Sequence, residues 1–219
     1  MLKLELNDRK SHYLTRLGIL NEVQALFQNT FNVDDNFGGI SFDYGDDEIE
    51  HYSFAFHKVP SIPTFWKAGV TDNNIITDVV ISSSAMNAIA YMSYKFKFYS
   101  KTANIMFLST GSRLYDSHLD LIKSLKKKRI TMIFNDDFFG KVTDIKVAAA
   151  LLNQPIKFTV EQDNIIVSFK EKDITFDSLN LSLNTFRKAF NVRIPKLRTQ
   201  KSRGVNYVQD HFENALKVN

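Results

Sequence analysis

Strand-like and helix-like segments alternate three times between residues 76 and 153, and this alternation constrains the fold more than any other feature of the sequence. The strand-like segments are short apolar runs rich in β-branched residues, and helical periodicity follows each of them. The runs are 78–82, 104–108 and 130–134, and the helical segments are 85–94, 116–128 and 141–153. Such alternation is typical of a parallel sheet with right-handed crossovers and helices on both faces. The sequence therefore predicts an α/β fold.

The flanking segments have different patterns. Residues 11–31 show the periodicity of an amphipathic helix with Ser11 as its N-cap, and 40–44 with 52–56 alternate as a β-hairpin. After the central region we expect a second hairpin and two helices, at 156–160 with 165–169, at 177–190 and at 205–217. We therefore predict two parts. Residues 1–70 form an N-terminal helix and hairpin element, and residues 71–219 form an α/β domain with a basic C-terminal extension.

Composition narrows the class of protein without indicating its chemistry. The 219 residues include 28 Lys and Arg against 24 Asp and Glu, so a net charge of +4 permits an anionic partner. The absence of cysteine excludes disulfides, thiolate zinc sites and cysteine nucleophiles, and favours a reducing compartment. Residues 1–8 carry charges where a signal peptide needs an apolar run, and no stretch approaches the roughly 18 apolar residues of a membrane span. We expect a cytoplasmic protein that does not associate with membranes.

Two segments carry charge of a single sign. Residues 34–50 contain seven acids and no Lys or Arg, but they do not match a calcium loop, because Gly38 and Gly45 fall where ligands belong. Residues 187–203 contain seven basic residues and no acid. Four of these are expected in a loop after Pro195, where they would neutralise phosphates of a nucleic acid: Lys196, Arg198, Lys201 and Arg203. A solvated basic surface is the alternative.

The ends of the three predicted strands are the expected place for a ligand, because open parallel sheets bind ligands beyond the carboxyl ends of their strands. These ends are 82–84, 109–113 and 135–141. The first has the pattern of a helix N-cap, and Arg113 in the second could bind a phosphate. In the third, Asp136 and Asp137 offer carboxylates to Mg²⁺, or one of them caps the next helix. Phe138 and Phe139 would close this cleft or face a partner.

These segments also resemble a known family. Residues 78–91 resemble the opening strand and helix of the toprim domain of bacterial primases and topoisomerases, and are closest to the primase-like branch associated with mobile elements. Residues 130–141 resemble the family's third strand with its Asp-x-Asp-x-x-Gly-(Arg/Lys) end, and 107–111 resemble the strand between them. The resemblance covers about residues 60–155. It implies a toprim-like parallel sheet flanked by helices, and a partner that is DNA.

The chain departs from this family at the positions that carry its chemistry. Ser83 stands where the family has the Glu that acts as general acid/base, Asn87 replaces an acid of the following helix, and Asn135 replaces the first Asp of Asp-x-Asp. Of the acids, only Asp137 is kept, followed by Gly140 and Lys141. Without its carboxylates a site binds Mg²⁺ weakly, and a serine hydroxyl cannot replace a carboxylate in proton transfer.

We therefore expect a catalytically degenerate toprim-like protein without a metal cofactor, related to DNA primase and mobilisation proteins. It would bind nucleic acid, or a replication or mobilisation protein. The residues expected to contact nucleic acid are Arg113, Lys141, Lys196, Arg198, Lys201 and Arg203.

Two other functions stay open. One is a Mg²⁺-dependent nucleotidyl-transfer enzyme or nuclease that uses Asp136 and Asp137. The other is a protein-interaction module, in which the segments 34–50 and 187–203 meet a partner or a second copy. No feature of the sequence fixes an oligomeric state.

Overall fold

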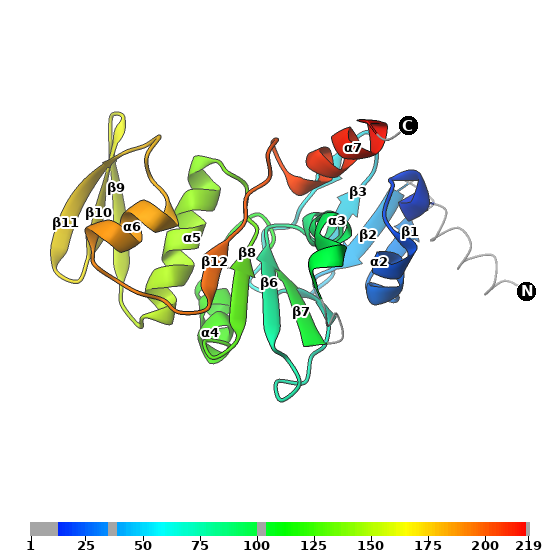
Figure 1. Cartoon of the computed structure of the whole chain (residues 1–219), viewed down its shortest axis with the longest axis horizontal. Coiled ribbons are helices and arrows are strands. Elements are labelled where there is room, and N and C mark those ends of the chain that lie inside the picture. Colours follow the sequence, from blue (N-terminus) through cyan, green and yellow to red (C-terminus); the bar gives the residue numbers. More distant parts are fainter. Residues whose placement is uncertain (1–12, 35–38, 100–103, 218–219) are drawn as a thin grey trace, which may run out of the picture.

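A five-stranded sheet forms the centre of the protein (Figure 1). The computed structural model describes residues 13–34, 39–99 and 104–217. The strands in spatial order are β12 (Leu197–Thr199), β8 (Arg129–Met132), β6 (Asp78–Ser82), β7 (Ile105–Ser109) and β5 (Trp66–Gly69). The first four run parallel, whereas the edge strand β5 runs antiparallel to β7. The predicted α/β fold is confirmed, with a mixed sheet instead of a purely parallel one.

Helices cover both faces of this sheet, as predicted. They are α3 (Ala85–Lys95), the short 3-10 helix η1 (Phe96–Phe98), α4 (Asp116–Ser124) and α5 (Phe138–Leu151). All five residues of β6 are buried, and successive side chains point to opposite faces. Val80 belongs to the hydrophobic core that includes α3, whereas Ile81 belongs to the core that includes α5. The middle of the central strand, Val79 to Ile81, is therefore apolar because both of its faces are covered.

The N-terminal residues form a second, antiparallel sheet. Its strands are β1 (Asn32–Asp34), β2 (Gly39–Asp43), β3 (Ile49–Tyr52) and β4 (His57–Lys58). The predicted hairpin is confirmed in β2 and β3, but the return strand ends at Tyr52. Phe54, assigned to it from the alternation of aromatic residues, lies beyond it and is largely exposed.

The single helix predicted over 11–31 is wrong. A helical turn at 13–16 ends at Gly18, whose φ of 77° is strained for other residues, and α2 (Asn21–Leu26) starts afresh. The backbone N–H groups of Gly18 and Ile19 close the first turn by donating to Thr15 and Leu14. The expected cap Ser11 lies outside the described residues.

The N-terminal sheet packs against the α3 face of the central sheet. Phe27 lies 4.7 Å from Phe107 and 5.9 Å from Trp66 between ring centroids, and Phe42 meets Trp66 edge to face at 5.8 Å. These rings form one continuous hydrophobic core with α3. Residues from both predicted parts therefore share a core, and β5, which precedes residue 70, is a strand of the central sheet.

The C-terminal third contains two strands more than predicted, β11 (Lys172–Asp177) and β12 (Leu197–Thr199). The expected hairpin is present as β9 (Ile156–Glu161) and β10 (Asn164–Phe169), and β11 extends it to three strands. Because β11 takes residues up to 177, the following helix α6 (Leu183–Ala189) starts later than predicted. The last helix, α7 (Tyr207–Lys217), lies close to its predicted position and packs Tyr207 against Tyr91 of α3.

The loop predicted after Pro195 is wrong as well. Residues 197–199 form β12, which extends the central sheet by pairing in parallel with β8. The pattern is too short to predict a strand, but Leu197 is buried in the core, and Arg187 of α6 donates to its carbonyl oxygen at 2.8 Å. In the described part of the chain no helix has the length and apolar character needed to cross a bilayer.

Candidate functional site at the strand ends

The three predicted strand ends meet in one pocket. The helix after β6 lies on one face of the sheet, whereas the helices after β7 and β8 lie on the other, and a crevice opens where the connections diverge. A pocket of about 250 Å³ occupies this position. Its polar lining comes from all three strand ends, namely Ser83, Thr110, Ser112, Asn135, Asp137 and Thr143. Phe139 lines it as well, although most of its side chain is exposed, whereas Phe138 does not line it.

Local hydrogen bonds shape the first two strand ends. Ser84 caps α3, because its Oγ accepts from the backbone N–H of Asn87 at 3.0 Å. In the second strand end, Gly111 has a φ of 72°, and a Cβ there would lie 2.5 Å from the carbonyl oxygen of Pro60. Glycine is therefore required where the N-terminal segment approaches this loop. The expected N-cap function of the serine run is confirmed at Ser84.

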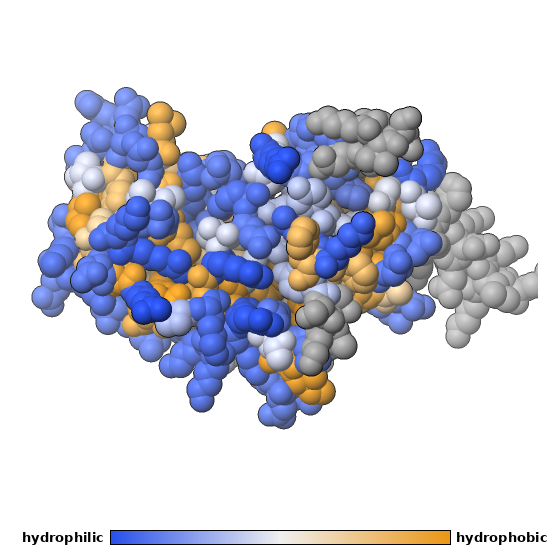
Figure 2. All heavy atoms as spheres, viewed as in Figure 1, coloured by the Kyte–Doolittle hydropathy of each residue, from blue (hydrophilic) through white to orange (hydrophobic). Residues whose placement is uncertain are grey.

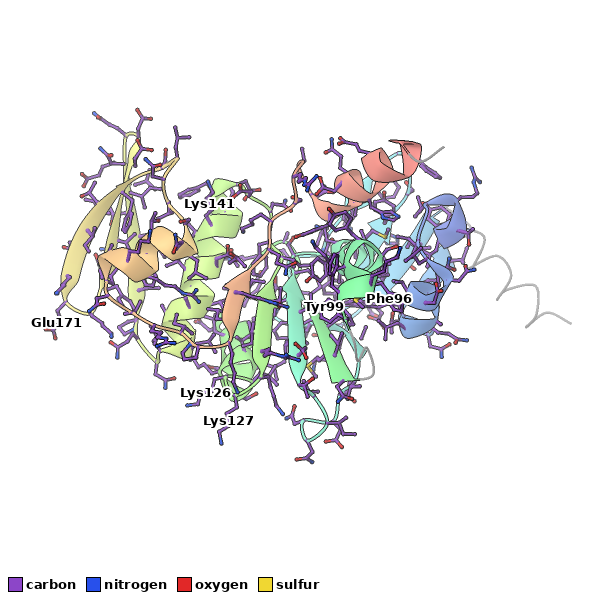
Figure 3. The ribbon with its side chains drawn as sticks, in the orientation of Figure 1. Phe96, Tyr99, Lys126, Lys127, Lys141 and Glu171 are labelled. Atoms are coloured by element: carbon purple, nitrogen blue, oxygen red, sulfur yellow. The ribbon has the colours of Figure 1, made fainter. Side chains whose placement is uncertain are left out.

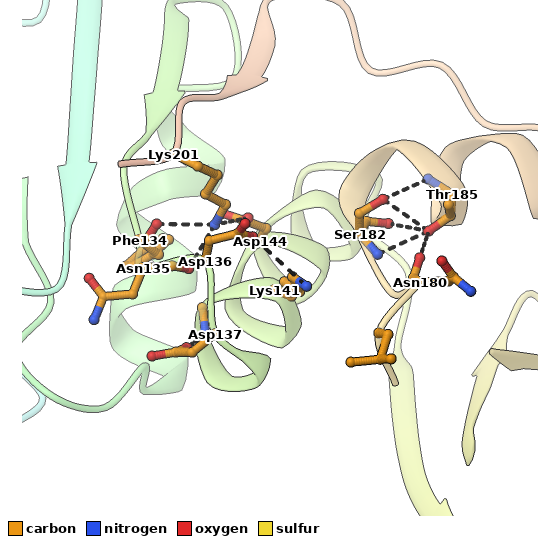
Figure 4. Close-up of polar contacts among 12 residues, drawn as sticks. Phe134, Asn135, Asp136, Asp137, Lys141, Asp144, Asn180, Ser182, Thr185 and Lys201 are labelled. Atoms are coloured by element: carbon orange, nitrogen blue, oxygen red, sulfur yellow. Dashed lines mark hydrogen bonds and ion pairs between the residues drawn. The ribbon is translucent and has the colours of Figure 1, made fainter. Parts of the chain in front are cut away.

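The two adjacent carboxylates do not converge. Asp137 caps α5, with its Oδ1 accepting from the N–H of Gly140 at 2.7 Å. Asp136 is exposed, and its Oδ1 lies 3.9 Å from Nζ of Lys141 (Figure 4). Gly140 lies so close to Asn135 that a Cβ would overlap the carbonyl oxygen of that residue. The loop is therefore fixed in a conformation that gives the two acids different partners.

This donor set does not fit Mg²⁺. Asp137 is the one carboxylate among the described residues that line the pocket, and the other oxygens there come from neutral groups. Asn87, which replaces a family acid, is buried in α3 and does not line the pocket, and its Oδ1 has no hydrogen-bond partner in the described structure. Nowhere in the described ranges do three His, Asp or Glu side chains form a group that could hold a metal ion.

A buried ion pair lies directly behind the end of β8. Nζ of Lys201 donates to Oδ2 of Asp144 at 2.7 Å, and to the carbonyl oxygens of Phe134 and Asn135 at 3.1 and 3.0 Å (Figure 4). An ammonium group is thus held against the strand end by three oxygens. Lys201, predicted to contact nucleic acid, already has three partners within the protein. Asp144 was not predicted, although it lies four residues from both Gly140 and Ala148 on the buried side of α5.

Burial of Asp144 has a measurable consequence. Its Oδ1 has no partner among the described residues, and burial raises the pKa of this carboxyl to about 6, although the Lys201 ammonium acts in the opposite direction. The nearby Asp136 also raises the pKa. The folded protein therefore binds the Asp144 proton more tightly than the unfolded chain does, so that proton stabilises the fold below pH 4 and the effect disappears as pH rises through 6.

We predict that Asp144→Asn removes this pH dependence. Between pH 7 and pH 5, wild type should gain about 1–2 kcal/mol in unfolding free energy relative to the variant, because the neutral acid is favoured in the fold. Urea unfolding at both pH values measures the difference. Asp173→Asn, at an exposed position of the C-terminal sheet, is the control and should keep the wild-type dependence. Parallel pH profiles of wild type and Asp144→Asn would show that Asp144 has an ordinary pKa.

The other basic residues predicted to contact nucleic acid are distributed over several elements. Arg113 is exposed over the ring of Tyr115, and Lys141 lies near Asp136. Lys196 donates to the carbonyl oxygen of Lys127. Arg203 is exposed, and its backbone N–H donates to Asp210. Arg198 lies on β12 and lines a different pocket, at the opposite end of the sheet. The structure does not bring these residues together at the strand-end pocket, and their contact with nucleic acid stays a prediction.

The sequence interpretation also missed a buried acid, Glu50 of β3. Its Oε2 accepts from the N–H of Ala85 at 2.7 Å and from the Tyr44 hydroxyl at 2.6 Å. Its Oε1 accepts from the N–H of Met86 at 3.1 Å and lies 2.9 Å from Nε2 of His57. Anions are stabilised at a helix N-terminus, so Glu50 holds the N-terminal sheet against the start of α3. It does not line the strand-end pocket and is enclosed by these partners.

Comparison with known proteins finds no family model, no curated protein and no solved structure that matches this chain. The class of the protein is therefore given by its architecture. It is an α/β protein with a mixed five-stranded sheet, helices on both faces, and a pocket at the carboxyl ends of its parallel strands whose described lining includes one carboxylate.

Proposed function

We propose that this chain is a catalytically degenerate toprim-like protein, related to primase and mobilisation proteins, that binds nucleic acid or a replication or mobilisation partner without metal-dependent chemistry. The composition of the strand-end pocket carries this proposal. Where the resemblance implies a cluster of carboxylates, the pocket has Ser83, Asn135 and a single acid, Asp137, whose carboxylate caps α5.

Charge at this edge of the sheet supports the same conclusion. The Lys201 ammonium lies 3.0 Å from the carbonyl oxygen of Asn135 and neutralises the buried Asp144. This ion pair adds no net negative charge beside the pocket, so little anionic charge offsets the dehydration of Mg²⁺ there. The pocket retains a shape formed by three strand ends, but the groups that line it are suited to hydrogen bonding and not to proton transfer.

A metal titration tests the loss of chemistry. Thermal unfolding is followed while Mg²⁺ or Mn²⁺ is added, and we expect the midpoint to stay unchanged, because the pocket has one carboxylate and that one is already hydrogen-bonded. Asp137→Ala loses a helix cap, which costs about 1 kcal/mol, so each variant is compared with itself without metal. A metal-induced rise that is present in wild type and absent in Asp137→Ala would contradict the proposal and favour the enzyme.

A binding measurement tests the partner. Fluorescence anisotropy with labelled single- and double-stranded DNA should detect binding at low salt that weakens as salt rises, because phosphate contacts release counterions. Single-stranded DNA, whose bases are exposed, is expected to bind more tightly than double-stranded DNA. A complete lack of binding to both DNAs at low salt would remove nucleic acid as the partner and leave the protein-partner form of the proposal.

A further inference from the structure

A second, larger pocket lies near the amino-terminal ends of β6 and β8, at the end of the central sheet opposite the strand-end pocket. Its volume is about 560 Å³, within the range of sites that bind small molecules. It opens between the C-terminal half of α3 with η1 and the part of the sheet formed by β6, β8 and β12 (Figure 1). We call it the basic groove and define it by Tyr91, Lys95, Phe98, Tyr99, Arg129 and Arg198. It shares no residue with the strand-end pocket.

Cations outnumber acids in the basic groove. Lys95, Arg129 and Arg198 line it, and Asp78 is the one acid among the described lining residues. Nη2 of Arg129 donates to Oδ2 of Asp78 at 2.6 Å, yet 65% of the Arg129 side chain is exposed. Arg198 is exposed and oriented by its Nε, which donates to Oγ1 of Thr131 at 2.8 Å. The groove thus presents two guanidinium groups, each held by one hydrogen bond, and guanidinium groups bind phosphate oxygens well.

Aromatic rings form the opposite wall. The Tyr91 hydroxyl lies 2.9 Å from that of Tyr99 and donates to Oε1 of Gln200 at 3.0 Å, which links α3 to the segment after β12. Burial raises the pKa of Tyr91 well above its ordinary value, so this hydroxyl stays protonated. Phe98 is 80% exposed at the rim, with Nζ of Lys95 5.4 Å from its ring centre. Figure 2 shows hydrophilic side chains over β8 and β12 beside a hydrophobic patch at α3.

We propose that the basic groove binds a nucleotide unit, with its phosphate against Arg129, Arg198 and Lys95 and its base against Phe98 and Tyr99. This inference rests on the proposed nucleic-acid binding and assigns a surface to it. Positive charge beside exposed rings is the arrangement that holds unpaired bases and their backbone, whereas a duplex hides the faces of its bases. The unit belongs either to a single strand or to a free nucleotide.

The experiment measures the anisotropy of a labelled oligothymidylate over a range of salt and, in a separate titration, that of labelled dTMP. Lys95→Gln with Arg198→Gln should weaken binding at least about tenfold and reduce the slope of log affinity against log salt by about 0.7, since the groove takes one phosphate and each single-strand phosphate contact contributes about 0.7. Phe98→Ala, at a position too exposed to affect folding, should weaken binding about fivefold or more through lost stacking.

Lys157→Gln with Lys172→Gln is the matched control, because it removes two exposed cations from the C-terminal sheet. In Figure 3, Glu171, the neighbour of Lys172, lies at the far end of the molecule from Tyr99. Equal losses in the control and groove variants would overturn the groove assignment and leave nucleic-acid binding intact. If wild type binds dTMP but no oligonucleotide, the groove stands as a nucleotide site. If it binds neither, the groove proposal fails, and the protein-partner form of the proposed function is left.

Discussion

Replacing Glu50 by alanine is expected to lower the unfolding free energy by about 3–5 kcal/mol, a large part of the stability of a typical domain. The side chain is fully buried and accepts from two N–H groups of α3 and from the Tyr44 hydroxyl. Alanine leaves the buried N–H of Met86 without its acceptor, and the N–H of Ala85 keeps only a longer contact of 3.2 Å with the Tyr44 hydroxyl. It also removes the negative charge from the helix N-terminus. Urea unfolding followed by circular dichroism gives the difference.

The neighbouring acid provides the control. Glu48 lies two residues earlier in the same acidic segment and is exposed, so Glu48→Ala should change stability by less than about 0.5 kcal/mol. Glu50→Gln should fall between the two, because its amide oxygen still accepts from an N–H of α3 while its NH₂ group faces another donor. Equal effects of Glu48→Ala and Glu50→Ala would show that Glu50 does not hold the N-terminal sheet to α3.

The central fold was predictable because its signals are local. The middle of the strand at 78–82 is apolar on both faces, and a helix with its own cap at Ser84 follows at once, so pattern and structure agree. The single helix over 11–31 was not correct, since the apolar spacing continues across Gly18 and only its backbone conformation separates the two helical segments. The strand β12 depends on pairing with β8 through Leu197 and Ile130, a contact between residues distant in the chain that periodicity does not encode.

The candidate site, like the fold, could be predicted only in part. The meeting of Ser83, Thr110 and Asn135 follows from the order of parallel strands, so topology alone predicted it. The partners of individual charged residues could not be predicted from this strand order. In the sequence, Glu50 is one of several acids in the segment 34–50, where charged side chains are expected to be solvated. Its burial becomes evident only when β3 is placed against α3. The basic groove lies between α3 and the strands β8 and β12, and no local pattern indicates that these elements face each other.

Lys201 should be the second position at which a single substitution has a large effect. We predict that Lys201→Met costs about 3–5 kcal/mol at pH 8, because it keeps the apolar stem but leaves the Asp144 carboxylate buried without a cation. The carbonyl oxygens of Phe134 and Asn135 lose a donor as well. At pH 5 the loss should be smaller, since burial already raises the pKa of Asp144 to about 6 and a neutral acid needs no counter-charge.

Urea unfolding of four proteins at both pH values checks this prediction. Lys146→Met removes an exposed charge from α5 and should cost less than about 0.5 kcal/mol. Combining Lys201→Met with Asp144→Leu should recover much of the loss, because a buried pair replaced as a whole leaves no unpaired charge. A double variant as unstable as Lys201→Met alone would instead show that the carbonyl oxygens at the end of β8 are the partners that matter. In that case the ammonium would serve to fix the strand-end loop, and its pairing with Asp144 would be secondary.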